Sequence, residues 1–277
     1  MHKRYLIIFF ALSFFGAECN SQNEANRQNK NPAADTTDER QTKNTLPASK
    51  IGDILLPDGY ERTEVSKNSF ASYLRNLELK TDDNTVYLYN GKPKGIQSSQ
   101  YAVLKIDRGN RDLQQCADAA MRLRSEYLYA QKKFSEIHFN FLSDGKARYY
   151  TDYAKGDYAY KKFRKYMDYI FAYANTASLK NELLPINNPQ NIQAGDIFIQ
   201  TGRPYGHAVT VMDMAENKNT GEIIFLLSQS YMPAQDIHIL VNPMNKNLSP
   251  WYEVKTSGEL RTPEWTFYWP DLMRFPE

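Results

Sequence analysis

A β-rich stretch between residues 195 and 231 decides the fold of this 277-residue chain. It reads Gly195-Asp196-Ile197-Phe198, then Gly206-His207-Ala208-Val209-Thr210-Val211 and, further on, Leu227-Ser228-Gln229-Ser230-Tyr231. Segments 197–200, 207–214 and 223–229 are short and apolar, and turn-forming residues separate them, which is typical of antiparallel strands. The loop over residues 217–221 predicts a hairpin between the last two segments.

Helical periodicity dominates the region before this stretch. Apolar residues recur at helical spacing over residues 69–79, 113–132 and 158–173, and a shorter helix is expected to begin at Thr176. Brief alternating runs predict four more strands, over residues 85–89, 102–106, 137–141 and 236–241. Helices therefore come mainly first and strands second, so the sequence predicts an α+β fold in a single domain over residues 51–277.

The N-terminus has the pattern of an export signal. Residues 1–18 combine a charged start (His2-Lys3-Arg4) with an apolar run that is too short to span a bilayer. Cys19 then follows Phe15-Gly16-Ala17-Glu18, which resembles a bacterial lipobox in which the cysteine is acylated, although Glu18 replaces the usual small residue. We expect an exported protein of the bacterial envelope, anchored to the membrane through Cys19 or otherwise periplasmic or secreted; an uncleaved form is a third alternative. The polar residues 19–50 are expected to be a disordered tether.

Composition excludes several classes of protein. The balance of 34 Lys and Arg against 32 Asp and Glu gives a net charge of +2, which does not favour nucleic acid as a partner. Two cysteines are too few for a disulfide framework or a four-thiolate zinc site. The chain also lacks the Gly-rich phosphate and dinucleotide loops and the His-Glu-x-x-His motif, so no cofactor and no metal are predicted.

Cys116 is the single thiol of the predicted domain. With Asp112 as the expected N-cap, Cys116 falls in the first turns of its helix, where free N–H groups favour a thiolate. It also lies on the apolar stripe of that helix, so a buried structural residue is the alternative. His207 begins a strand directly after a Gly/Pro loop, a suitable place for a catalytic base, whereas His138 and His238 are expected to be ordinary strand residues.

Strand alternation suggests how these groups meet. It places His207, Val209, Val211 and Asp213 on one face, which we expect to pack on the Cys116 helix. The same alternation along the returning strand favours Gln229 over Ser228 as the group that orients the imidazole, and Asp236 is a weaker alternative. Asn110, six residues before Cys116, and Ser228 are further candidates for stabilising an oxyanion or contacting the substrate.

The strand block and the upstream cysteine resemble NlpC-type peptidases and CHAP amidases. In these papain-like enzymes of bacterial cell walls, a cysteine opens a helix, a Gly-Asp strand follows, the next strand begins with His, and a polar residue on the following strand completes a triad. The resemblance implies a papain-like fold and the triad Cys116, His207 and Gln229. The chain differs in its gap of about 80 residues between Cys116 and Gly195 and in lacking an aromatic residue beside the cysteine.

A closer resemblance covers most of the chain. The phrases Arg111-Asp112-Leu113-Gln114-Gln115-Cys116-Ala117-Asp118, Ile137-His138-Phe139-Asn140-Phe141 and Ser230-Tyr231-Met232-Pro233-Ala234-Gln235-Asp236-Ile237-His238 are similar to an uncharacterised family of Bacteroidetes-type exported proteins, a domain of unknown function. That resemblance implies a bacterial envelope protein with one domain.

Two functions follow from these patterns. The first is a cysteine hydrolase that cleaves an amide bond in peptidoglycan or a related envelope peptide. The alternative is a papain-like envelope lipoprotein without catalytic activity, which binds glycan or peptide or has a structural role in assembly. Either way, the expected partner is a peptide or glycan of the cell wall or envelope.

Overall fold

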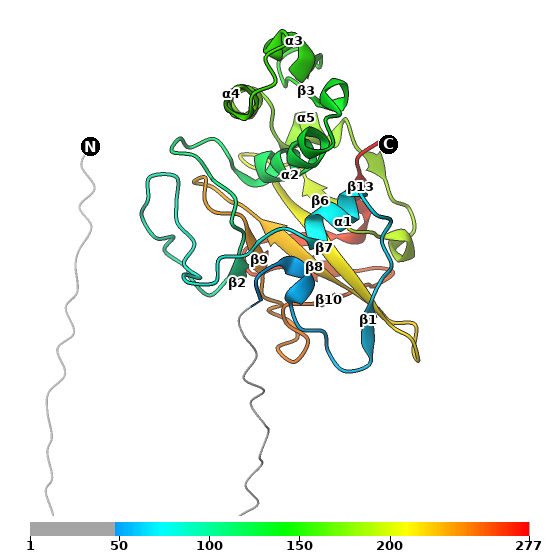
Figure 1. The fold of residues 1–277 in the computed structure, drawn as a ribbon. Coiled ribbons are helices and arrows are strands. Elements are labelled where there is room, and N and C mark those ends of the chain that lie inside the picture. The colour runs from blue at the N-terminus through cyan, green and yellow to red at the C-terminus, as the bar shows by residue number, and fades with distance from the viewer. Residues whose placement is uncertain (1–47, 277) are drawn as a thin grey trace, which may run out of the picture. The chain divides into compact units, whose positions relative to one another are not determined.

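A nine-stranded antiparallel sheet lies at the centre of the structure (Figure 1). The computed structural model describes residues 48–276, which lie within one compact unit. The predicted signal peptide, Cys19 and almost all of the predicted tether are outside the described residues. Seven strands follow the order β2-β9-β8-β7-β6-β13-β5, while β1 pairs with β7 and β10 with β8. Their bounds are β1 Tyr60–Arg62, β2 Gln100–Val103, β5 Leu184–Pro185, β6 Ile197–Gln200, β7 His207–Asn217, β8 Ile223–Gln229, β9 His238–Leu240, β10 Tyr252–Glu253 and β13 Leu272–Arg274.

Two hairpins and five α-helices complete the fold. The hairpins are β3–β4 (His138–Asn140 and Ala147–Tyr149) and β11–β12 (Glu259–Arg261 and Thr266–Tyr268). The helices are α1 Phe70–Arg75, α2 Cys116–Ala130, α3 Tyr150–Ala154, α4 Tyr160–Phe171 and α5 Thr176–Lys180. The α+β class is therefore confirmed. Within the described part of the chain, no helix combines the length and apolarity needed to cross a membrane.

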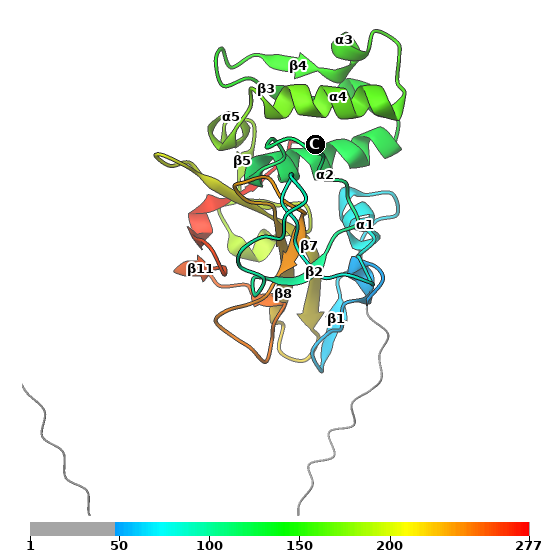
Figure 2. The same ribbon diagram turned by 90° about the vertical axis from the view of Figure 1, so that its left-hand side faces the viewer.

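Helix α2 separates the sheet from the more distant helices. Figure 2 shows α2 between α4 and the sheet. Ala117 and Ala120 of α2 share a core with Ala208 of β7 and with Phe163 and Met167 of α4. Small residues on both α2 and β7 let the helix approach the strand closely.

The other face of the sheet is covered by the C-terminal region. There Val209 and Val211 of β7 pack with Phe198 of β6, Phe267 of β12 and Trp269. The expectation that the His207 face packs on the Cys116 helix is therefore wrong. Because side chains alternate along a strand, the helix instead covers the face that carries Ala208.

A β-bulge in β7 ends the expected alternation. The register with β8 shifts between Val211 and Asp213, and Val211 and Met214 consequently belong to the same core. Asp213 is fully buried and forms ion pairs with Arg62 and with Arg75 of α1. Asp213 thus holds α1 and the N-terminal segment on the sheet.

The segment predicted as a strand over residues 85–89 makes only isolated bridges, Tyr87 to Pro93 and Leu88 to Gln235. At the start of the segment, the backbone donors are bound by side chains instead. The amide of Val86 donates to Gln97 Oε1, and the amide of Tyr87 donates to Asp236 Oδ2, both at 3.0 Å. Side-chain acceptors therefore replace the neighbouring strand that a continuous ladder would need.

Candidate functional site

Cys116 is the first residue of α2. The N-cap is Gln115, whose backbone amide donates to Asp118 Oδ2 at 3.0 Å. The expected cap, Asp112, instead accepts from the Gln115 side chain at 3.0 Å and from the amide of Ala234 at 2.7 Å. The helix thus begins later than predicted, because its capping box is formed by Gln115 and Asp118. Cys116 consequently lies nearer to the unpaired N–H groups of the helix start than the sequence predicted.

The Cys116 thiol is largely buried, with 7% of the residue exposed. Its Sγ atom contacts the carbonyl oxygen of Gly206 at 3.9 Å. Burial, followed by the charge of Asp118, raises the pKa of the Cys116 thiol to about 11. The sulfur therefore keeps its proton at neutral pH. Among the described residues, no hydrogen bond joins this thiol to an imidazole.

A cavity of about 330 Å³ opens beside Cys116. Its walls are the start of α2, residues 174–177 at the start of α5, and the loop over residues 201–206. That loop comes so close to its neighbours that a Cβ atom on Gly206 would lie 2.2 Å from the carbonyl oxygen of Gln200 and 2.6 Å from Thr176 Oγ1. Glycine at position 206 therefore lets the loop pass and line the cavity.

His207 lies just beyond that loop with its orientation determined by Gln229. The imidazole Nε2 is 2.9 Å from Gln229 Oε1, and the residue is only 1% exposed. Because an amide oxygen accepts only, Nε2 must carry the hydrogen, which leaves Nδ1 with a free lone pair. Burial lowers the pKa of His207 to about 4, so the imidazole is neutral at pH 7. The alternation that favoured Gln229 places it beside His207, as predicted.

The Gln229 amide is itself held by a buried polar network. Its Nε2 donates to Glu264 Oε2 at 2.7 Å, and that carboxylate forms an ion pair with Lys94. The same Nε2 lies 3.4 Å from Nε2 of His238, whose Nδ1 donates to the carbonyl of Asp236. His238 is fully buried at the start of β9, so it is a strand residue, as predicted, and it also contacts Gln229. With acceptors around its nitrogen, Gln229 has to present its oxygen to His207.

Tyr231 packs against the imidazole of His207. Its ring lies edge-on to that of His207, with 4.7 Å between the ring centroids. Burial, then Glu264, then Cys116 raise the pKa of Tyr231, which places its hydroxyl within electrostatic range of the sulfur. On other sides the imidazole contacts the rings of Trp265 and Phe267. Tyr231 therefore packs against the predicted base and senses the charge of the predicted nucleophile.

The remaining predicted site residues lie elsewhere. Asn110 is exposed and is not part of the cavity wall beside Cys116. Ser228 is buried, and its Oγ has no hydrogen-bond partner in the described structure; it is one residue out of step with Gln229 and so points to the opposite face of the sheet. Asp236 forms ion pairs with Lys80 and Arg108 rather than orienting His207.

Four contributors to the site were not singled out from the sequence. Tyr231, Lys94, Glu264 and Asp118 come from separate segments, and nothing in their local patterns indicates that they converge. For Asp118, the available signal is its position two residues after the predicted nucleophile. Over the described residues 48–276, no cluster of three or more His, Cys, Asp or Glu side chains could hold a metal ion.

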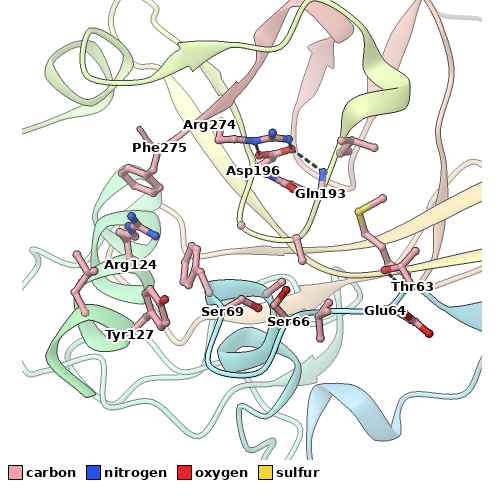
Figure 3. Close-up of a pocket in the computed structure, with 18 of the residues that line it drawn as sticks. Thr63, Glu64, Ser66, Ser69, Arg124, Tyr127, Gln193, Asp196, Arg274 and Phe275 are labelled. Carbon is pink, nitrogen blue, oxygen red and sulfur yellow. Dashed lines mark hydrogen bonds and ion pairs between the residues drawn. The ribbon is translucent and has the colours of Figure 1, made fainter. Parts of the chain in front are cut away.

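A larger cavity of about 640 Å³ lies beside the middle of α2 (Figure 3). In it the Arg124 guanidinium lies over the rings of Phe70, Tyr127 and Phe275, with 5.4 to 5.6 Å to each centroid. Neither Cys116 nor His207 lines this cavity. The larger cavity is therefore separate from the predicted catalytic residues.

The Gly195-Asp196 pair of the predicted motif has a structural role at this larger cavity. Both oxygens of buried Asp196 accept from Arg274, at 2.6 and 2.8 Å (Figure 3). Gly195 has a φ of +101°, and a Cβ there would lie 2.7 Å from the Phe70 ring. The pair thus turns the chain into β6 and ties β6 to the C-terminal strand.

Comparison with known proteins gives the family but no activity. Neither the curated proteins nor the solved structures contain a significant match to this chain. One family model, described as a domain of unknown function (4846), matches residues 52–274. That span includes α2, the whole central sheet and every residue of the Cys116 and His207 environment. The chain therefore belongs to the family described as domain of unknown function 4846.

Proposed function

We propose that this protein is an exported, papain-like cysteine hydrolase that cleaves an amide bond in peptidoglycan or a related peptide of the bacterial envelope. One observation carries the proposal. The thiol at the start of α2 contacts the carbonyl of Gly206, and the next residue, His207, is held by Gln229 in the tautomer that leaves Nδ1 as a proton acceptor. The order of these residues in the chain, which resembles that of NlpC and CHAP enzymes, adds support.

Thiol and imidazole are both neutral at pH 7, so the chemistry would begin with general-base catalysis rather than with a ready-made thiolate. Sγ attacks the carbonyl carbon while Nδ1 of His207 takes the thiol proton. The carbonyl π electrons move to oxygen, where the backbone N–H of Cys116 stabilises the charge. Collapse then breaks the C–N bond, and the imidazolium returns its proton to the leaving amine. Water hydrolyses the resulting thioester.

The His207 ring lies on the face of β7 opposite the one that α2 covers, so binding of substrate must bring the thiol and the imidazole together. Tyr231 packs edge-on against the imidazole, so its side chain would shift if His207 turned toward Cys116. Apo sites commonly have looser catalytic contacts than the complexes they form. The loop over residues 201–206 lines the cavity and would contact the substrate at the same time.

The pH dependence of kcat/KM tests this assignment of protons. His207 has a pKa of about 4 and Cys116 a pKa of about 11. Activity should fall as pH drops through about 4, because protonated His207 cannot accept the thiol proton, and it should be level between pH 6 and 9. Circular dichroism at each pH separates this loss from unfolding. A rate that climbs steadily from pH 6 to 9 would contradict the prediction, since it would mean that a free thiolate reacts without His207.

A second candidate function is binding of an envelope peptide or glycan without catalysis. The specific observation in its favour is the buried, protonated thiol, which has no hydrogen bond to an imidazole in the described structure. Its envelope location, like that of the hydrolase, rests on the predicted signal peptide and on the proposed lipid anchor at Cys19.

Digestion of purified sacculi distinguishes the two functions. The chain with Cys19→Ser is used so that Cys116 is its sole thiol, and soluble peptides and new amino groups are measured by mass spectrometry. The hydrolase should release peptides, and prior alkylation of Cys116 should stop the release. Sacculi that bind the protein in a sedimentation assay but release nothing support the binding function. Release that survives complete alkylation rules out cysteine chemistry.

A further inference from the structure

The cavity beside Cys116 contains a second chemically unusual group, Asp118. The residue lines the cavity, and only 7% of it is exposed. Its two carboxyl oxygens have different environments. Oδ2 accepts from the backbone amide of Gln115 at 3.0 Å, whereas Oδ1 has no hydrogen-bond partner among the described residues.

A buried carboxyl oxygen without a partner is energetically costly, above all when it is charged. Asp118 does form a capping box with Gln115, but that role occupies only one of its two oxygens. Capping therefore does not account for Oδ1. A bound ligand could supply the missing partner, because the residue lines a cavity large enough for part of a peptide.

The protonation state determines which ligand atom fits. Burial raises the pKa of Asp118 well above its usual value, and the charge of a deprotonated Asp118 would oppose formation of a thiolate at Cys116. Both effects favour the neutral acid. A neutral carboxyl group with Oδ2 engaged as an acceptor has its O–H on Oδ1, and a hydroxyl donor there suits an uncharged acceptor such as an amide carbonyl oxygen.

We propose that Asp118 is a substrate-binding and oxyanion-stabilising residue, whose neutral carboxyl donates a hydrogen bond from Oδ1 to the carbonyl oxygen of the amide under attack by Cys116. The inference rests on the proposed function and adds a side-chain donor to the backbone N–H of Cys116. The cavity is lined by Asp112 and Asp118 and, among the described residues, by no Lys or Arg side chain, so a bound carboxylate would lack a counter-charge and neutral amides are favoured.

Two substitutions separate this role from helix capping. Asp118→Asn keeps an oxygen for the Gln115 amide and presents an N–H in place of the O–H. Asp118→Ser keeps the cap but removes the second carboxyl oxygen, Oδ1. The chain contains a precedent for this serine at the start of α5, where Ser178 Oγ accepts from the amide of Asn175 at 2.9 Å. Asp152→Asn on α3 serves as a control for loss of a carboxylate away from the cavity.

The first readout is alkylation of Cys116 in the Cys19→Ser chain, which requires no turnover. Iodoacetamide carries an amide carbonyl and iodoacetate a carboxylate, and their rate ratio is normalised to that of free glutathione. Wild type and Asp118→Asn should prefer iodoacetamide by about tenfold, the value of one hydrogen bond of this type. Asp118→Ser should lose the preference, and Asp152→Asn should keep it. Equal ratios in wild type, Asn and Ser, or a loss in Asn as large as in Ser, would overturn the inference.

The second readout is peptide release from sacculi. Asp118→Ser should lower kcat by about 10² to 10³ with little change in KM, as expected for loss of an oxyanion donor, while Asp118→Asn should stay within about tenfold of wild type. The two hypotheses fail differently. No release combined with the expected alkylation pattern overturns the hydrolase and supports Asp118 as a binding donor. Normal release with kcat unchanged in Asp118→Ser overturns the role of Asp118 alone.

Discussion

Replacing Cys116 by alanine is expected to lower the rate of peptide release from sacculi by a factor on the order of 10⁵ or more, the effect of removing a nucleophile. In the proposed mechanism, the sulfur forms the covalent bond to the substrate carbon, and no other thiol exists within residues 48–276. His207 and Gln229 cannot compensate, because they act only on the proton of that thiol.

Stability measurements make the Cys116 result interpretable. The thiol is a small buried group at a helix start, so Cys116→Ala should unfold at nearly the same temperature as wild type. Cys19→Ser, which removes the other cysteine of the chain, should leave the rate of release unchanged. A Cys116→Ala protein that retained a tenth or more of the wild-type rate would exclude Cys116 as the nucleophile.

Replacing Asp213 by alanine should lower the free energy of unfolding more than any other substitution proposed for this protein. Its carboxylate is fully buried and accepts from Arg62 Nε at 2.8 Å and Arg75 Nε at 2.7 Å. Removing it leaves two partly buried guanidinium groups without their counter-charge, which costs about 3–5 kcal/mol. For a domain of this size, that corresponds to a decrease in Tm of roughly 10 °C.

Thermal unfolding followed by circular dichroism measures this effect. The matched control is Asp144→Ala, which removes a carboxylate that pairs with Arg148 at 2.7 Å on the surface. Solvent screens that pair, so its Tm should stay close to that of wild type. Equal decreases in Tm for the two variants would contradict the importance assigned to burial. Peptide release by Asp213→Ala below its Tm should persist, because Asp213 does not line the Cys116 cavity.

The local sequence pattern correctly predicted the strands around the proposed base, His207. Residues 197–200 and 223–229 form strands with the predicted limits, and β7 begins at His207 as expected. The pairing of His207 with Gln229 also followed from alternation, since the start of β7 and the end of β8 lie on one side of the bulge, where the register is regular. Period-two geometry therefore predicts neighbours correctly as long as the ladder is uninterrupted.

The sequence predictions were wrong where the structure depends on contacts between segments that are far apart in the chain. Helix α2 begins at Cys116 and not at residue 113 as predicted. Asp112 binds the amide of Ala234, more than a hundred residues away, and Gln115 and Asp118 form the capping box in its place. The face of β7 that α2 covers depends on which side carries small residues, and Ala208 provides the closer fit to Ala117. Alternation identifies two faces of a strand but does not say which of them a given helix will cover.

The sequence by itself determined the α+β class, the strand limits around His207 and the identities of Cys116, His207 and Gln229 as candidates, because these depend on periodicity and chain order. Only the tertiary structure decided how those groups are charged and connected. The neutral imidazole, the protonated thiol and the network through Glu264 and Lys94 all depend on burial. Burial is produced by packing of segments far apart in the chain, and a local sequence pattern does not contain it.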